Sequence, residues 1–90
     1  MYSKTTTVLN ASGLHARPAA VFAKQAGGYE SKVTIKNVTK NGAPLDASSM
    51  IAIMMLSAKA GDEVEIAAEG ADETRAVDEL VALLESGCGE

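Results

Sequence analysis

Two short segments of this 90-residue chain alternate apolar and polar side chains, and this pattern restricts the possible folds most. The apolar positions expected to face inward are Val33 and Ile35 in SKVTIKN and Val64, Ile66 and Ala68 in EVEIAAE. Successive side chains of a strand point to opposite faces, so such segments are typical of strands that bury one face only. Strands of a doubly wound parallel sheet are apolar almost throughout, so the pattern favours an antiparallel sheet with one covered face.

Two more strands are predicted from β-branched residues and turn signals. YSKTTTVLN is rich in threonine and predicts a strand at the start of the chain. The Asn41-Gly42 pair is a turn signal, and it predicts a short strand that ends near Pro44 or Leu45 and pairs with KVTIK.

Three segments have the apolar spacing of helices. The apolar stripes are Ala19, Phe22, Ala23 and Ala26 in ARPAAVFAKQAGG and Val77, Leu80, Val81 and Leu84 in ADETRAVDELVALLESG. Between them, SSMIAIMMLSAKAG predicts a helix capped by Ser48 or Ser49 and terminated at Gly61. Asp72 is the expected cap of the last helix, and Gly87 is its expected end.

The predicted order is therefore β-α-β-β-α-β-α within one domain, residues 1–90. Helices gathered on one face of an antiparallel sheet make an α+β fold, the open-faced β-sandwich. The chain has only three aromatic residues among its 47% hydrophobic residues, so aliphatic side chains must fill the core.

Composition excludes several classes of partner. The net charge of −4 argues against a nucleic-acid partner, which would need a basic face. No apolar run is long enough to span a bilayer, and polar residues follow Met1, so neither direct membrane binding nor a signal peptide is expected. The single cysteine, Cys88, cannot form an internal disulfide and is interpreted as a solvated thiol in a frayed tail. We expect a cytoplasmic monomer.

The stretch NASGLHARPAA places the only histidine, His15, where a helix is about to begin. Free N–H groups and the dipole at a helix start favour anions, and the guanidinium of Arg17 suits phosphate. Gly13 allows a sharp turn before the helix, and Pro18 is tolerated in its first turn. The same positive field disfavours imidazolium, so His15 could act as a nucleophile that carries a phosphoryl group.

Simpler interpretations of these residues remain open at this point. A lone histidine near a helix start is most often an exposed cap, and Arg17 can be ordinary surface charge. A metal site is disfavoured because no second histidine or cluster of cysteines and carboxylates accompanies His15. A hydrolytic triad is also disfavoured, since nothing in the sequence would order one.

GLHARPA resembles the active-site signature of the HPr family, the histidine-containing phosphocarriers of the bacterial phosphoenolpyruvate-dependent sugar phosphotransferase system. The resemblance covers essentially the whole chain. SSMIAIMML is similar to the segment with the family's regulatory serine and second helix, and KAGDEVEIAAEGADE to the stretch leading into the final helix. The family fold, a four-stranded antiparallel sheet covered by three helices, agrees with the predicted one.

The resemblance implies a role for each residue of the signature. His15 would accept a phosphoryl group through its Nδ1 atom from phosphorylated enzyme I and donate it to the A domain of a sugar-specific enzyme II. Arg17 would pair with the phosphoryl oxygens, and the backbone N–H groups of Ala16 and Arg17 would complete the cradle. No cofactor is implied, and the chain would be a carrier rather than an enzyme.

The second predicted helix is apolar almost all round, although only one face can meet the sheet. We expect Ile53 and Leu56 in the core and Met50, Ile51 and Met54 in an exposed docking patch. A fully buried helix is the alternative. The resemblance implies that partners bind this surface together with Ala20 and Lys24 of the first helix.

The chain departs from the family's pattern in places. Gly27 stands where relatives often have a basic residue, which predicts weaker electrostatic attraction to partners, and NVTKNGAP is longer than the usual hairpin connection. SSM offers two serines for the regulatory position, and the spacing favours Ser49 over Ser48. A serine kinase or phosphorylase would then be a further partner.

Two other functions compete with the sugar phosphocarrier. One is a carrier in a nitrogen-related or purely regulatory phosphotransferase chain. The other is a non-catalytic interaction module that binds partners through its methionines. His15 together with Arg17 argues against the module, because simple binding would need neither residue.

Overall fold

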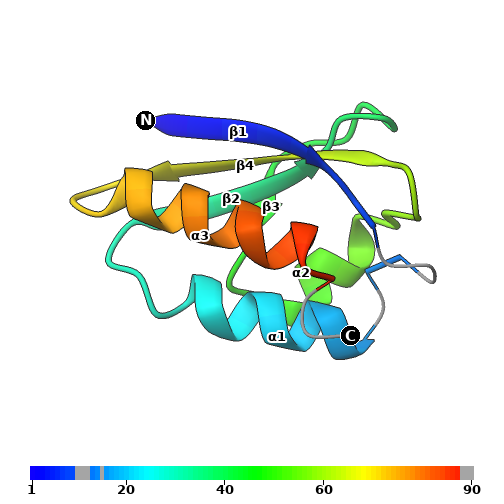
Figure 1. Ribbon diagram of the computed structural model, residues 1–90, viewed down its shortest axis with the longest axis horizontal. Coiled ribbons are helices and arrows are strands. Elements are labelled where there is room, and N and C mark those ends of the chain that lie inside the picture. Colours follow the sequence, from blue (N-terminus) through cyan, green and yellow to red (C-terminus); the bar gives the residue numbers. More distant parts are fainter. Residues whose placement is uncertain (10–12, 15, 88–90) are drawn as a thin grey trace.

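The computed structural model describes residues 1–9, 13–14 and 16–87. Four antiparallel strands form one sheet in the order β1-β4-β2-β3: β1 (Tyr2–Thr7), β2 (Lys32–Asn37), β3 (Leu45–Asp46) and β4 (Glu63–Glu69). Three helices cover one face of that sheet: α1 (Ala16–Ala26), α2 (Met50–Met55) and α3 (Glu73–Glu85) (Figure 1). The predicted element order and the open-faced sandwich are confirmed.

The period-two alternation places the two faces of the central strands in different environments. Ile35 of β2 lies opposite Ile66 of β4, and both side chains are fully buried beneath the helices. On the outer face, Lys36 and Glu65 lie opposite each other and form an ion pair at 3.5 Å. The sheet therefore has one apolar face and one polar face, as the alternation predicts.

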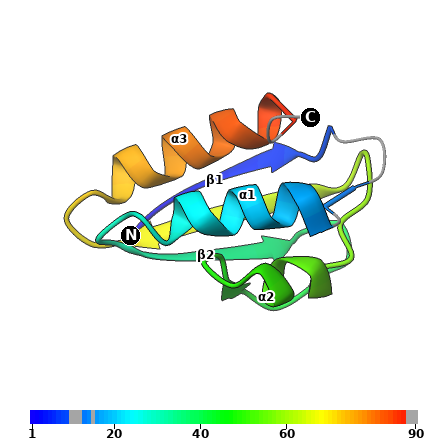
Figure 2. The same ribbon diagram turned by 90° about the horizontal axis from the view of Figure 1, so that it is seen from below.

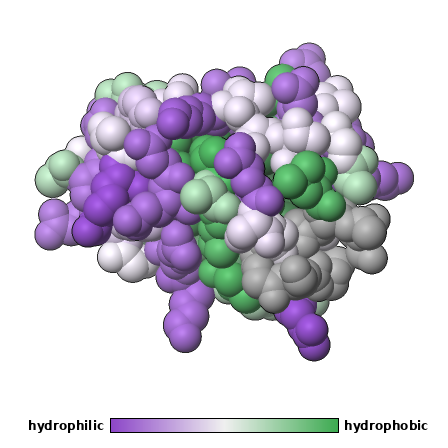
Figure 3. Space-filling view, in the orientation of Figure 1, coloured by the Kyte–Doolittle hydropathy of each residue, from purple (hydrophilic) through white to green (hydrophobic). Residues whose placement is uncertain are grey.

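The helices contribute the other half of the core. α3 packs on β1 and β4, whereas α1 packs on both α2 and α3 (Figure 2). Phe22, Ile53 and Leu80 are fully buried, one from each helix. On the side that carries α1 and α3, hydrophilic residues cover most of the surface and apolar residues gather in a strip through its middle (Figure 3).

Two predicted boundaries are wrong. The short strand β3 begins where it was expected to end, at Leu45, because Asp46 lies opposite Thr34 of β2 and fixes the register. α2 ends at Met55 rather than near Gly61. Ser57, just after it, has φ +53°, a left-handed conformation that a continuing helix cannot contain.

Asp72 occupies the cap position of α3, yet its side chain makes no capping hydrogen bond. Its carboxylate instead accepts hydrogen bonds from the backbone N–H groups of Glu30 at 3.0 Å and Ser31 at 2.9 Å. The predicted cap is therefore correct in position but wrong in chemistry. At the other end, α3 stops at Glu85, and Gly87 has φ +81°, in agreement with the predicted stop.

Some predictions concern residues outside the described ranges. His15 and Cys88 both lie there. Within the described ranges, the helices are all too short or too polar to cross a bilayer.

Candidate functional site

The candidate site is centred on the first turn of α1. Ala16 is the first helical residue and Arg17 follows it, and both are exposed, whereas Pro18 is buried. The first N–H groups of a helix have no acceptor within the helix, and the macrodipole makes this end partially positive. The backbone of Ala16 and Arg17 therefore presents donors suited to an anion, directly after His15 in the sequence.

Arg17 carries a charge that no described carboxylate neutralises. Within residues 1–9, 13–14 and 16–87, it forms no ion pair or hydrogen bond through its guanidinium. A guanidinium that is exposed and uncommitted can turn toward an incoming phosphoryl group and bind two of its oxygens.

The backbone just before His15 is held by the loop that follows α2. The N–H of Leu14 donates to the carbonyl oxygen of Ala58 at 3.1 Å. Gly13 has φ +73°, and a Cβ atom there would lie only 2.3 Å from the same oxygen. The sequence indicated Gly13 as a turn residue, but the role of Ala58 depends on a contact between distant segments and has no local signal.

α2 presents an exposed apolar surface, as the sequence predicted. The exposed side chains are Met50 at 40%, Ile51 at 68%, Met54 at 42% and Met55 at 69%. Ile53 is fully buried, so the alternative of a completely buried helix is wrong. Met55 belongs to the exposed set but was not predicted there. Single exposed apolar residues are ordinary, whereas four on one short helix are typical of a docking surface.

α1 adds to the surface beside α2, because the two helices pack together. Ala20 and Lys24 are exposed on α1. α2 begins beside the end of α1, where a Cβ atom on Gly27 would lie 3.8 Å from Ser48 Cβ. The loop after α2 contacts the residues that precede α1, so the helices run antiparallel. The apolar surface of α2 thus extends toward the start of α1.

The two serines before α2 have different roles. The Oγ atom of Ser49 accepts a hydrogen bond from the N–H of Ala52 at 3.2 Å and caps the helix. The hydroxyl of Ser48 donates to Asp46 at 2.6 Å, and its hydrogen bonds lower the pKa of that carboxyl. The structure therefore assigns the cap to Ser49.

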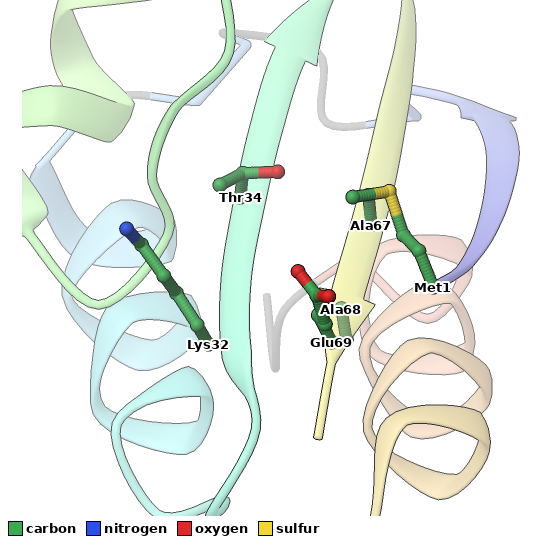
Figure 4. A pocket seen from close by; sticks show the side chains of 6 residues that line it. All are labelled: Met1, Lys32, Thr34, Ala67, Ala68 and Glu69. Atoms are coloured by element: carbon green, nitrogen blue, oxygen red, sulfur yellow. The ribbon is translucent and has the colours of Figure 1, made fainter.

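A shallow pocket of about 190 Å³ lies elsewhere, on the sheet face that points away from the helices (Figure 4). Its lining consists of Met1, Lys32, Thr34, Ala67, Ala68 and Glu69. None of the predicted site residues lines it. The described part of the chain also contains no group of three histidine, cysteine or carboxylate side chains placed to hold a metal ion.

Known proteins of one family are similar to this chain over almost its whole length. The family model for the "PTS HPr component phosphorylation site" matches residues 2–86. The phosphocarrier protein HPr of Cupriavidus necator is 39% identical over 90 residues, covering 100% of this chain and 98% of that protein. The phosphocarrier protein NPr of Proteus mirabilis is 37% identical over 87 residues, covering 97% and 94%.

The fold agrees equally well with a solved structure. HPr-C-His from Thermoanaerobacter tengcongensis superposes with a TM-score of 0.90 at 39% sequence identity, covering 100% of this chain and 98% of that one. The agreement therefore includes the helix start that follows His15 and the element order around it. On sequence and structure together, this chain belongs to the HPr family of phosphocarrier components of the phosphotransferase system.

Proposed function

We propose that this chain accepts a phosphoryl group on His15 from phosphorylated enzyme I and donates it to the A domain of a sugar-specific enzyme II. The observation that carries the proposal is the family match over residues 2–86 together with Arg17 in the first turn of α1. The chain is then the acceptor and donor of the group rather than an enzyme, and it works in the cytoplasm.

The geometry around α1 supports this role. Phosphoryl transfer depends mainly on positioning and on electrostatic stabilisation of the transferred group. The N–H groups of Ala16 and Arg17 and the Arg17 guanidinium, which pairs with no residue of the described ranges, are suited to provide that stabilisation without enclosing a phosphate. An open site suits a carrier, because tight binding of the phosphoryl group would slow its onward transfer.

The apolar surface of α2 supports docking to protein partners. Met50, Ile51 and Met54 are exposed on a helix that packs beside α1, and methionine side chains adapt to different partner surfaces. We assign Ala20 and Lys24 to the same docking surface.

A carrier in a nitrogen-related phosphotransferase chain is the second candidate. The chain is 37% identical to an NPr protein and 39% identical to an HPr protein, so sequence identity supports this candidate almost as well as the first. The two candidates share the site chemistry and differ in their partners.

One experiment tests both candidates. The chain is incubated with phosphoenolpyruvate and either enzyme I of the sugar system or its nitrogen-related counterpart, and the acid-labile adduct is measured by mass spectrometry. We expect rapid labelling by the sugar-system enzyme and none in a folded His15→Ala variant. Labelling only by the counterpart would support the second candidate, and a labelled His15→Ala variant would contradict both.

A further inference from the structure

The loop of residues 56–62 is hydrogen-bonded to two other segments of the chain. One is the segment that precedes α1, and the other is the end of β2 with the turn that follows it. On one side, the N–H of Leu14 donates to Ala58 O at 3.1 Å. On the same side, the N–H of Gly61 donates to Val8 O at 2.9 Å. The position of Leu14, the residue before His15, therefore depends on where this loop lies.

On its other side, the loop is held by Asn37 and Lys40. Asn37 is almost fully buried at the end of β2, and its Nδ2 atom donates to Leu56 O at 3.2 Å and to Asp62 Oδ2 at 3.3 Å. Its Oδ1 atom accepts from the N–H of Lys40 at 3.1 Å. The Nζ atom of Lys40 donates to Ser57 O at 2.6 Å. Three of these bonds join the end of β2 and its turn to the 56–62 loop, and the bond from Lys40 N–H to Asn37 fixes the turn itself.

The backbone of the loop needs this support. Ser57 has φ +53°, in the left-handed region that is unfavourable for a residue other than glycine. Such a conformation persists only when its surroundings hold it. The acceptors Leu56 O and Ser57 O belong to the two peptide groups on either side of the Ser57 Cα atom. Asn37 and Lys40 therefore hold the loop at its strained residue.

We infer that Lys40 is a positioning residue for phosphotransfer, which acts through the 56–62 loop on the backbone at Leu14. The inference rests on the proposed function of His15, since it concerns the placement of that acceptor. A reacting group displaced by about 1 Å can lose about a hundredfold in rate, so a residue that touches no phosphate can still affect transfer.

Three variants test the inference. Lys40→Met keeps the aliphatic stem and removes the donor to Ser57 O, and Lys40→Arg restores a charged donor. Lys36→Met is the matched control, because it removes a nearby lysine of β2 that pairs with Glu65 on the outer face of the sheet and does not contact the 56–62 loop. Lys40 is exposed and Lys36 is partly exposed, and thermal unfolding checks that each variant is folded at the assay temperature.

The first readout is hydrogen exchange of the Leu14 amide, measured by NMR. We expect exchange to be about threefold to tenfold faster in Lys40→Met, close to wild type in Lys40→Arg, and unchanged in Lys36→Met. This readout does not involve phosphate. Unchanged Leu14 exchange in a folded Lys40→Met variant would overturn the inference.

The second readout is transfer from phosphorylated enzyme I. We expect kcat of enzyme I to fall about threefold to tenfold with Lys40→Met as acceptor, and the KM of enzyme I for this chain to stay nearly unchanged, because the docking surface on α1 and α2 is intact. Equal kcat in Lys40→Met and wild type would refute the positioning role. Failure of the proposed function is distinguished from this result, because wild type itself would then form no adduct.

Discussion

Ser31 donates its backbone N–H to the carboxylate of Asp72 at 2.9 Å, and its hydroxyl donates to the same oxygen. The two residues are 41 positions apart, and their contact ties the loop before β2 to the start of α3. The hydroxyl of Ser31, followed by the N–H of Glu30, lowers the pKa of Asp72 from 3.8 to about 2. Gly70 lies against the same serine, since a Cβ atom there would come within 2.7 Å of it.

We predict that this contact makes stability depend on pH in the acid range. The pKa of Asp72 is lower in the folded state, so its stabilisation is complete above about pH 4 and is lost as pH falls through about 2. Urea unfolding at pH 5, 3 and 2 should show a steeper loss for wild type than for Asp72→Asn. Glu69→Gln, an exposed carboxylate on β4, is the control and should follow wild type. Parallel curves for wild type and Asp72→Asn would contradict this assignment.

Arg17 should matter for transfer more than for folding. A hydrogen bond to a charged group contributes about 1.5–3 kcal/mol, so Arg17→Ala should slow phosphotransfer by about one to two orders of magnitude. The side chain is exposed, so the melting temperature should change little. Arg17→Lys keeps the charge without the planar guanidinium, and its phosphotransfer rate should lie between those of wild type and Arg17→Ala. Unchanged rates in Arg17→Ala, measured by quenched-flow labelling, would mean that the backbone N–H groups suffice.

Neighbouring residues of α2 should separate docking from stability. Met54 is exposed, so Met54→Asp should weaken binding to enzyme I while changing the free energy of unfolding by about 0.5 kcal/mol or less. Ile53 is fully buried, so Ile53→Ala should cost about 2–5 kcal/mol. Binding is measured by calorimetry and stability by urea unfolding. A Met54→Asp variant with wild-type affinity would remove α2 from the docking surface.

Phosphorylation of Ser49 is predicted to inhibit the carrier. A phosphate at the start of α2 adds about −1.5 to −2 charges beside Met50 and Ile51, where it would hinder docking of an apolar or acidic partner. The helix start tolerates negative charge, so the fold should survive. Ser49→Asp should therefore fold normally and accept phosphate from enzyme I much more slowly than wild type.

Ser48→Asp is the matched comparison for Ser49, since the hydroxyl of Ser48 bonds to Asp46 and does not cap α2. We expect a smaller effect on the labelling rate from Ser48→Asp. Equal rates for Ser49→Asp and wild type would leave helix capping as the whole role of Ser49.

Replacing Ser57 by glycine should stabilise the protein. The left-handed conformation costs serine about 1–2 kcal/mol, whereas glycine loses about 0.5–1 kcal/mol more conformational entropy on folding. The first effect is larger, so Ser57→Gly should raise the free energy of unfolding by about 0.5–1 kcal/mol in urea titrations. A loss of stability would show that the hydrogen bonds around the loop already compensate the strain.

The parts of the fold that follow from local pattern were predictable. Val33 and Ile35 alternate with polar residues, and Phe22 and Leu80 lie on apolar stripes, so the burial of each follows from its own segment. Ser49 was named as a possible cap of α2 for the same reason, because capping is a local hydrogen bond.

The wrong predictions concern features that depend on contacts between segments distant in sequence. The end of α2 at Met55 is set by a loop whose carbonyls bind Asn37 and Lys40, which no helical propensity encodes. For the same reason, the carboxylate of Asp72 accepts hydrogen bonds from Glu30 and Ser31 instead of capping α3. At the candidate site, Arg17 and the helix start were readable from sequence, whereas the contact of Leu14 with Ala58 was not.

The place of β1 at the edge of the sheet has a consequence for biosynthesis. Its residues pair with β4, from Tyr2 opposite Ala68 to Thr7 opposite Glu63, so the partner strand leaves the ribosome about sixty residues later. Closing so long a loop slows folding, and β1 cannot pair until β4 has been synthesised. The polar side chains of Ser3, Lys4 and Thr5 make the waiting strand a poor template for aggregation in a crowded cell.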